Sequence, residues 1–291
     1  MKANRQICSL FFSWVFTLSL VFGGCSAVVD PSRNQCATDQ DCADRGGAFT
    51  GSKCVVNLCQ SPSSEKAGPW GCLGNVTWPT STSGTHNVSM FVVDIITGKP
   101  FPGLAARVCY KLDTTCVSPM LSGLTSDSEG RIAFSVNSGF DGFLESTGTD
   151  VFPFSYFFYP PITSDRVVSN MPVLQPDDLA KFSSLVKVEL MPDRGHILAR
   201  AYNCQGKIAD GIRFSTSGGD GSTSPFYMIA GIPSTRESAT DGSGTGGLLN
   251  VPEGAATLIG TVVESGKTLG KPLSVVARAG RITYTAVVPS P

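Results

Sequence analysis

Short apolar runs, in which every second residue is often polar, cover most of the chain after its first seventy residues. A strand-like run at 87–93 is followed by an alternating run at 104–108, and Ile132, Phe134 and Val136 repeat with a period of two. This period is typical of strands that bury one face. Gly and Pro residues separate the runs, so the pattern predicts antiparallel sheets joined by tight turns.

The turn residues of the first half have counterparts in the second half: Gly98 and Gly206, Gly103 and Gly211, Asp127 and Asp241, and Gly130 and Gly244. A repeated order of strand, glycine turn, strand and Asp-x-x-Gly turn suits a sandwich of antiparallel sheets. We therefore expect an all-β fold with two tandem antiparallel β-sandwich modules, at 72–172 and 195–291.

The connector at 173–194 has a helical rather than a strand period. Pro176 and two aspartates open a segment in which Leu179, Phe182 and Leu185 follow at intervals of three. Proline and acidic residues favour the first turn of a helix. The connector is thus predicted to hold one short helix that covers a sheet edge or joins the modules.

The first 24 residues have the pattern of an export signal. Lys2 and Arg5 precede an uncharged stretch at 7–22, which is short for a membrane-spanning helix, and small residues follow at 23–24. We expect residues 1–24 to be removed after export.

The end of this segment, Gly23-Gly24-Cys25, resembles the lipobox of bacterial lipoproteins, although Phe22 replaces the leucine usual there. The resemblance implies that Cys25 carries a lipid and, because Ser26 follows it, that the protein is anchored in an outer membrane. Secretion without a lipid is the alternative.

Of ten cysteines, Cys8 leaves with the signal and Cys25 is assigned to the lipid, which leaves Cys36, Cys42, Cys54, Cys59, Cys72, Cys109, Cys116 and Cys204. An even number in an exported chain predicts disulfides. Segment 25–60 is too small for a core, so two crosslinks are expected among its four cysteines, in any of three pairings. Beyond the linker at 61–71, Cys109 and Cys116 suit a local hairpin, which leaves Cys72 for Cys204. A zinc site is the alternative for the four cysteines of segment 25–60, but their spacing lacks paired C-x2-C knuckles.

Charge and motifs give no sign of catalysis. The chain has 22 basic and 23 acidic residues, a balance that gives no electrostatic basis for binding nucleic acid. It has two histidines, His86 and His196, and neither lies beside a recognisable partner motif. The glycine pattern at 242–247 formally fits a dinucleotide motif, but Pro252 follows too soon for a helix. We expect no enzymatic activity, no cofactor and no metal.

Two aromatic clusters are candidate binding surfaces. In the run at 152–159, alternation places Phe157 and Tyr159 on one face, where they would form an exposed platform for sugar rings or a partner chain. Burial against the predicted helix is the alternative. Phe226 and Tyr227, in the long loop of the second module, form the other candidate surface, with packing inside the loop as the alternative.

The motifs Thr97-Gly98, Pro102-Gly103-Leu104 and Asp127-Ser-Glu-Gly130 resemble those of carboxypeptidase regulatory-like domains, which are seven-stranded sandwiches of prealbumin-like topology. Segment 36–59 resembles Dickkopf-like cysteine-rich segments, and the whole arrangement resembles myxobacterial-type lipoproteins. These resemblances imply a non-catalytic lipoprotein, attached to the membrane by its lipid, whose modules bind or organise an envelope protein or a carbohydrate. A structural spacer without a ligand, or an enzyme with an unrecognised site, is the alternative.

Overall fold

The computed structural model of the 291-residue chain describes residues 36–45, 53–55, 58–60, 68–78 and 83–291. These residues belong to two compact units, 1–65 and 66–291, which are described separately. The expected signal segment 1–24 and the expected lipid-attachment residue Cys25 lie outside the described residues.

The described part of the first unit is a short helix and a two-stranded antiparallel sheet: α1 (Asp39–Ala43), β1 (Lys53–Val55) and β2 (Leu58–Gln60). The backbone N–H groups of Ala37 and Thr38 donate hydrogen bonds to the Asp41 carboxylate at 2.7 and 2.8 Å. These bonds cap the helix and hold the pKa of Asp41 below its usual range. The sequence predicted one helix only, because α1 has five residues and no apolar period to reveal it.

The second unit contains two β-sandwich repeats and a helix between them. The first repeat has β3 (Thr85–Asp94), β4 (Ala105–Tyr110), β5 (Leu121–Thr125), β6 (Arg131–Asn137), β7 (Gly142–Ser146), β8 (Phe154–Phe157) and β9 (Arg166–Val173). Helix α2 spans Pro176–Val186. The second repeat has β10 (Arg194–Ala201), β11 (Ile212–Thr216), β12 (Ser224–Ile229), β13 (Ile232–Ser234), β14 (Thr245–Pro252), β15 (Gly254–Val262), β16 (Leu273–Ala277) and β17 (Ile282–Val287).

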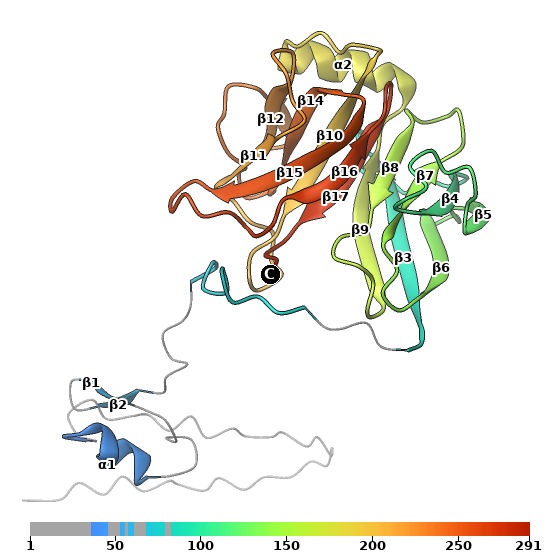
Figure 1. The fold of residues 1–291 in the computed structure, drawn as a ribbon. Helices are drawn as coiled ribbons and strands as arrows, with labels where there is room; N and C mark the ends of the chain where they lie inside the picture. The colour runs from blue at the N-terminus through green and yellow to red at the C-terminus, as the bar shows by residue number, and fades with distance from the viewer. Residues whose placement is uncertain (1–35, 46–52, 56–57, 61–67, 79–82) are drawn as a thin grey trace, which may run out of the picture. The chain divides into compact units, whose positions relative to one another are not determined.

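The described strands of this unit form three sheets, which can be followed in Figure 1. One sheet has nine strands in the order β13-β12-β14-β10-β17-β8-β7-β4-β5, and two have three strands each, β6-β3-β9 and β11-β15-β16. The predicted all-β class with two sandwiches is confirmed. The pairing differs from the expectation in one respect, because three pairs among the described strands are parallel: β3 with β9, β10 with β17, and β8 with β17.

The pairing of β8 with β17 fuses the two repeats into one sheet. Tyr284 of β17 comes from the second repeat but packs in the core of the first, where its ring meets Phe154 edge-on with centroids 5.7 Å apart. Val287 lies on the opposite face of β17 and packs in the second core. The two three-stranded sheets therefore cover opposite faces of the nine-stranded sheet.

The predicted internal repeat is visible in matching hydrogen bonds. In the first repeat the Ser126 hydroxyl accepts a hydrogen bond from the backbone N–H of Leu104 at 2.9 Å. In the second repeat the Thr240 hydroxyl accepts the same bond from Ile212 at 3.0 Å. Each of these side chains lies just before the Asp-x-x-Gly turn. In both copies the bond therefore fastens this turn to the start of the strand that follows Gly103 or Gly211.

Helix α2 begins where the sequence predicts. Pro176 occupies its first turn, and the backbone N–H of Gln175 donates a hydrogen bond to the Asp178 carboxylate at 3.2 Å. The Gln175 side chain also donates to Asp94 at the end of β3, at 3.0 Å. The start of the helix is therefore tied to the first sandwich.

The apolar face of α2 packs on the nine-stranded sheet. Phe182 meets Phe226 of β12 edge-on, with ring centroids 5.2 Å apart. Val186 is buried, whereas Leu185, which the sequence spaced three residues after Phe182, is 57% exposed. The reason is the helical period of about 3.6 residues, which aligns position 186 rather than 185 with Phe182.

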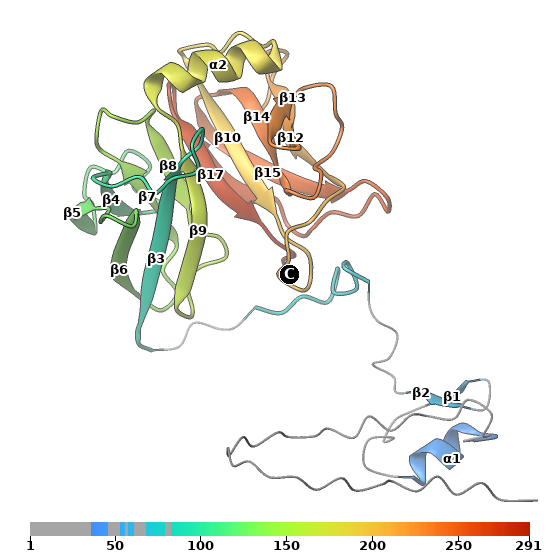
Figure 2. The same cartoon turned by 180° about the vertical axis from the view of Figure 1, so that it is seen from behind.

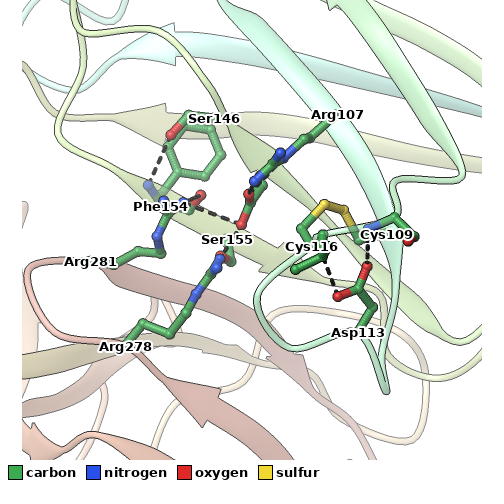
Figure 3. A network of polar contacts seen from close by, with 12 residues as sticks. Arg107, Cys109, Asp113, Cys116, Ser146, Phe154, Ser155, Arg278 and Arg281 are labelled. Carbon is green, nitrogen blue, oxygen red and sulfur yellow. Dashed lines mark hydrogen bonds and ion pairs between the residues drawn. A yellow bond between two sulfur atoms is a disulfide. The ribbon is translucent and has the colours of Figure 1, made fainter.

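A buried carboxylate ties the two repeats together, and Figure 3 labels its arginine partners, Arg107, Arg278 and Arg281. Glu145 of β7 is 1% exposed and accepts hydrogen bonds from Arg107 of β4 and from Arg278, which follows β16. Arg281 lies 3.5 Å from the same carboxylate, and Arg278 also donates to the Ser155 hydroxyl at 2.7 Å. Burial, helped by the charge of the neighbouring Arg278, lowers the pKa of Arg281 to about 10. The Arg281 side chain therefore stays charged at neutral pH. Three guanidinium groups from both repeats thus share one carboxylate.

Replacing Glu145 by Gln should lower the free energy of unfolding by about 3–5 kcal/mol, because the guanidinium groups then lose their shared charge partner in a buried place. The control Asp141→Asn breaks the Lys111–Asp141 pair, which is 3.2 Å long and partly exposed, and should cost less than about 1 kcal/mol. Urea denaturation of both variants measures the difference. Equal losses would contradict a special role of Glu145.

A second buried ionisable group, His196 of β10, lines a small apolar cavity together with Phe182 of α2. Its side chain is 4% exposed, and its Nδ1 accepts a hydrogen bond from the backbone N–H of Asn250 at 3.2 Å. Burial lowers the pKa of His196 to about 4. Between this value and the ordinary histidine pKa near 6.5, the folded protein binds fewer protons than the unfolded chain.

Stability should therefore fall as the pH is lowered from about 6.5 to 4, by up to roughly 3 kcal/mol from His196. His196→Gln keeps a hydrogen-bond acceptor but does not titrate, so its free energy of unfolding should vary less over this range. Denaturation curves at several pH values test this, and identical slopes for wild type and His196→Gln would refute it.

Candidate ligand-binding cleft

The second unit has an open cleft of about 830 Å³ between the edge strand β9 and the centre of the nine-stranded sheet. The floor of the cleft is formed by β8, β17 and β10, and one wall is formed by β9. Segment 68–78, called the strap below, lies at the rim of the cleft. The volume falls in the range of ligand sites, roughly 300–1,000 Å³. α2 and the C-terminus lie at opposite ends of the unit in both views, and the strap lies near the C-terminus (Figures 1 and 2).

The floor is set by the register of three neighbouring strands. Leu198 of β10 pairs with Tyr284 of β17, which pairs with Tyr156 of β8. One step further along the same face, Arg200 pairs with Ala286. Because Ala286 has a small side chain, the floor is hollow between Arg200 and its larger neighbours.

The strap is held at the rim by covalent and polar contacts. A disulfide joins Cys72 to Cys204 with a Cα–Cα distance of 5.7 Å, and the backbone N–H of Cys204 donates to the Pro69 carbonyl at 2.9 Å. The Trp78 indole N–H donates to the Pro289 carbonyl at 3.3 Å, and its ring meets Tyr159 edge-on at 5.2 Å. These contacts fix an aromatic pair at the mouth of the cleft.

The charge of the cleft is positive. Arg166 of β9 and Arg200 of β10 line it, and no Asp or Glu does so among the residues that the structure describes. Arg166 donates a hydrogen bond to the Pro160 carbonyl at 2.8 Å, and Arg200 makes a long contact of 3.4 Å to the Thr245 hydroxyl. Within the described ranges neither guanidinium group forms an ion pair.

Burial shifts the pKa values of several ionisable groups that line the cleft. It raises the pKa of Tyr156 to about 12 and raises the pKa of Tyr284 as well. Burial also lowers the pKa of Arg166, an effect that the Tyr156 phenol opposes. At neutral pH the cleft therefore presents neutral phenol groups beside two cationic guanidinium groups.

The free edge of β9 is interrupted. β9 pairs with β3 on one side and with no other described strand. Asn170 has a positive φ of 53°, and Pro172 has no backbone N–H to donate. Both features prevent a continuous ladder of hydrogen bonds along this edge.

Of the four aromatic residues proposed from the sequence, the structure places Tyr159 at the cleft. The other three are buried, so their proposed exposure is wrong: Phe157 is 4% exposed, Phe226 2% and Tyr227 1%. The predicted platform of Phe157 and Tyr159 therefore does not exist as an exposed pair.

Each of the three buried rings has its own packing partner. Phe157 stacks on Phe143 at 4.9 Å, beside the Cys109–Cys116 disulfide and not against α2. Phe226 lies under α2. Tyr227 packs in the second core, where its hydroxyl accepts a hydrogen bond from the backbone N–H of Phe214 at 3.1 Å. The segment read as a long loop is strand β12, which explains why both of its aromatic side chains are buried.

Sequence reasoning missed most of the cleft: Trp78, Tyr156, Arg166, Arg200, Tyr202 and Tyr284. One signal was present in the sequence, because the small residues Ala199 and Ala201 alternate with Arg200 and Tyr202. This alternation marks a strand with one apolar and one polar face. The parallel pairing that brings β10, β17 and β8 together left no comparable signal.

The cysteines of the described residues form disulfides. Cys36 is bonded to Cys54, Cys72 to Cys204 and Cys109 to Cys116, and the last two are the pairs that the spacing suggested. Cys42 is also disulfide-bonded, whereas the side chain of Cys59 lies outside the described residues. The sulfurs of Cys36, Cys42 and Cys54 lie within 4.8 Å of one another. Because these sulfurs are oxidised, they are a crosslinked group and not a set of thiolate metal ligands.

The two histidines lie apart from the cleft lining. His86 Nδ1 is 3.9 Å from the Asp165 carboxylate, and His196 contacts the backbone of Asn250. Among the described residues neither histidine is hydrogen-bonded to a Ser or Cys side chain. None of the described helices is both long and apolar enough to cross a bilayer.

No family model and no curated protein matches this chain. Solved structures give weak structural matches. The Bacillus anthracis TIE protein has 9% identity and a TM-score of 0.26, with 71% of this chain and 34% of that chain covered. The major pilin subunit BcpA of Bacillus cereus has 14% identity and a TM-score of 0.25, with 67% and 69% covered. The shaft pilin SpaA from Lactobacillus rhamnosus GG has 12% identity and a TM-score of 0.22, with 72% and 99% covered.

This chain thus spans about a third of the length of the TIE protein. TM-scores at this level do not establish a shared function.

Proposed function

We propose that this protein is a non-catalytic binding protein of the cell surface that holds a saccharide in its cleft. The supporting observation is the lining of the cleft, which combines aromatic side chains from four segments with two arginines. The aromatic residues are Trp78, Tyr156, Tyr159, Tyr202 and Tyr284.

This lining suits sugars because aromatic rings and pyranose rings are complementary. The C–H faces of a sugar ring pack on aromatic faces, while phenol and guanidinium groups exchange hydrogen bonds with sugar hydroxyls. Tyr202, Tyr159 and Trp78 are partly exposed, so their rings are accessible to a ligand. The cleft therefore offers both kinds of contact that a saccharide requires.

An extended peptide is the rival ligand, because β9 presents an edge to the cleft. A peptide strand binds such an edge through a regular series of backbone hydrogen bonds. The positive φ of Asn170 and the missing N–H of Pro172 interrupt this series after the first half of β9. This interruption favours a ligand that binds through side chains.

Both repeats contribute to the lining of the cleft, which supports a rigid site. Arg166 belongs to the first repeat and Arg200 to the second, and the β8–β17 pairing holds the two repeats together. A preformed site loses less entropy on binding than one that must be ordered. A spacer without a ligand would have no need for a hollow lined in this way.

Tyr202→Ala should weaken saccharide binding about tenfold or more, because its half-buried ring lines the cleft. The matched control is Tyr110→Ala, which removes a 51% exposed tyrosine that is not part of the lining. A glycan array followed by calorimetry with the best retained oligosaccharide measures the effect. Equal affinities for the two variants, or retention of extended peptides only, would contradict the proposal.

Membrane attachment through Cys25 is the second part of the proposal, and it is supported by the sequence Gly23-Gly24-Cys25 after the apolar stretch. Each buried CH₂ of an acyl chain contributes about 0.8 kcal/mol, so several chains anchor a protein stably. The wild type should enter the detergent phase and have the mass of a lipidated N-terminus, whereas Cys25→Ala should remain in the aqueous phase. Equal partition and no lipid mass would show that the chain is secreted without an anchor.

A further inference from the structure

We infer that the ligand of the cleft is an acidic saccharide, whose carboxylate or sulfate group binds between Arg166 and Arg200. This inference rests on the proposed function and adds the charge of the ligand to it.

Both arginines line the same cleft. Arg200 rises from the floor, where the small Ala286 is its neighbour on β17, and Arg166 stands on the β9 wall. Tyr156 lines the cleft together with both arginines, and both guanidinium groups oppose the rise that burial causes in the pKa of its phenol. A negatively charged group bound in the cleft beside Tyr156 is therefore attracted to both arginines.

Arg166 and Arg200 differ from the other partly buried arginines of this chain in having no carboxylate partner among the described residues. Arg107, Arg194, Arg278 and Arg281 each lie within 4.0 Å of a carboxylate. Arg166 and Arg200 are partly buried as well, but within the described ranges they have no acidic partner. A partly dehydrated cation without a counterion is unfavourable, and a bound anion removes this cost.

Hydrogen-bond donors remain for such an anion. A guanidinium group has five N–H donors in a planar fork. Arg166 uses one terminal nitrogen for the Pro160 carbonyl, and Arg200 uses its Nε for the long contact with Thr245. The other terminal nitrogen of Arg166 and both of Arg200 are left to bind carboxylate or sulfate oxygens.

The decisive experiment compares ligands that differ in charge but little in shape. Trigalacturonate and its neutral methyl ester form one pair, and a sulfated galactose disaccharide and its desulfated form are the other. Calorimetry with the full chain should show at least tenfold tighter binding for the acidic member of one pair, because charge-assisted hydrogen bonds are stronger than neutral ones. Added salt should weaken the binding of that acidic member more than that of the neutral one.

Arg200→Gln is the main variant, because among the described residues the long contact with Thr245 is the one hydrogen bond of the Arg200 guanidinium group. It should reduce the acid-to-neutral preference to about one, while Arg213→Gln, which removes the same charge from an exposed position on β11, should leave it intact. Arg166→Lys keeps the charge and should retain part of the preference. Thermal unfolding of each variant confirms that it is folded.

The outcomes separate this inference from the proposed function. If neutral and acidic members bind equally and Tyr202→Ala weakens both, the cleft is a saccharide site and the inference is wrong. If acidic ligands bind but Tyr202→Ala and Arg200→Gln have no effect, the cleft is not the site and both are wrong. If neither acidic ligand binds better than its neutral form, the inference is likewise overturned.

Discussion

The parallel pairing of β8 with β17 is the contact on which the rest of the second unit depends. It places a strand of the second repeat in the core of the first, through Tyr284, and it brings Arg278 and Arg281 to the buried Glu145. It also sets Tyr156, Tyr284 and Leu198 side by side as the floor of the cleft. Core, ionic network and cleft are therefore three results of one strand pairing.

The fusion also explains how a repeated sequence produces a site that neither repeat has alone. Matching turns at Ser126 and Thr240 show that the two copies share a local design. Their three-stranded sheets nevertheless cover opposite faces of the common sheet. On the face that β6-β3-β9 covers, the cleft lies between β9 and the centre of the nine-stranded sheet, and Arg166 and Arg200 line it.

Local patterns predicted local features well. The alternation of Ile132, Phe134 and Val136 identified β6, and Pro176 with its acidic neighbours identified the start of α2. The aromatic residues were harder, because a strand with two buried faces gives no alternation. Phe226 and Tyr227 are adjacent and both buried, one beneath α2 and the other in the second core. The cleft was not predictable, because the pairing of β8 with β17 joins segments more than a hundred residues apart without a local signal.

The disulfide between Cys72 and Cys204 determines how the molecule carries mechanical load. Tension applied to the chain before Cys72 passes through the sulfur atoms directly to the second repeat, at the rim of the cleft. When the opposing force acts on a residue after Cys204, the intervening polypeptide, which includes the whole first sandwich and α2, is bypassed by the covalent path. A molecule held from its N-terminal side can thus be pulled without its first sandwich being stretched.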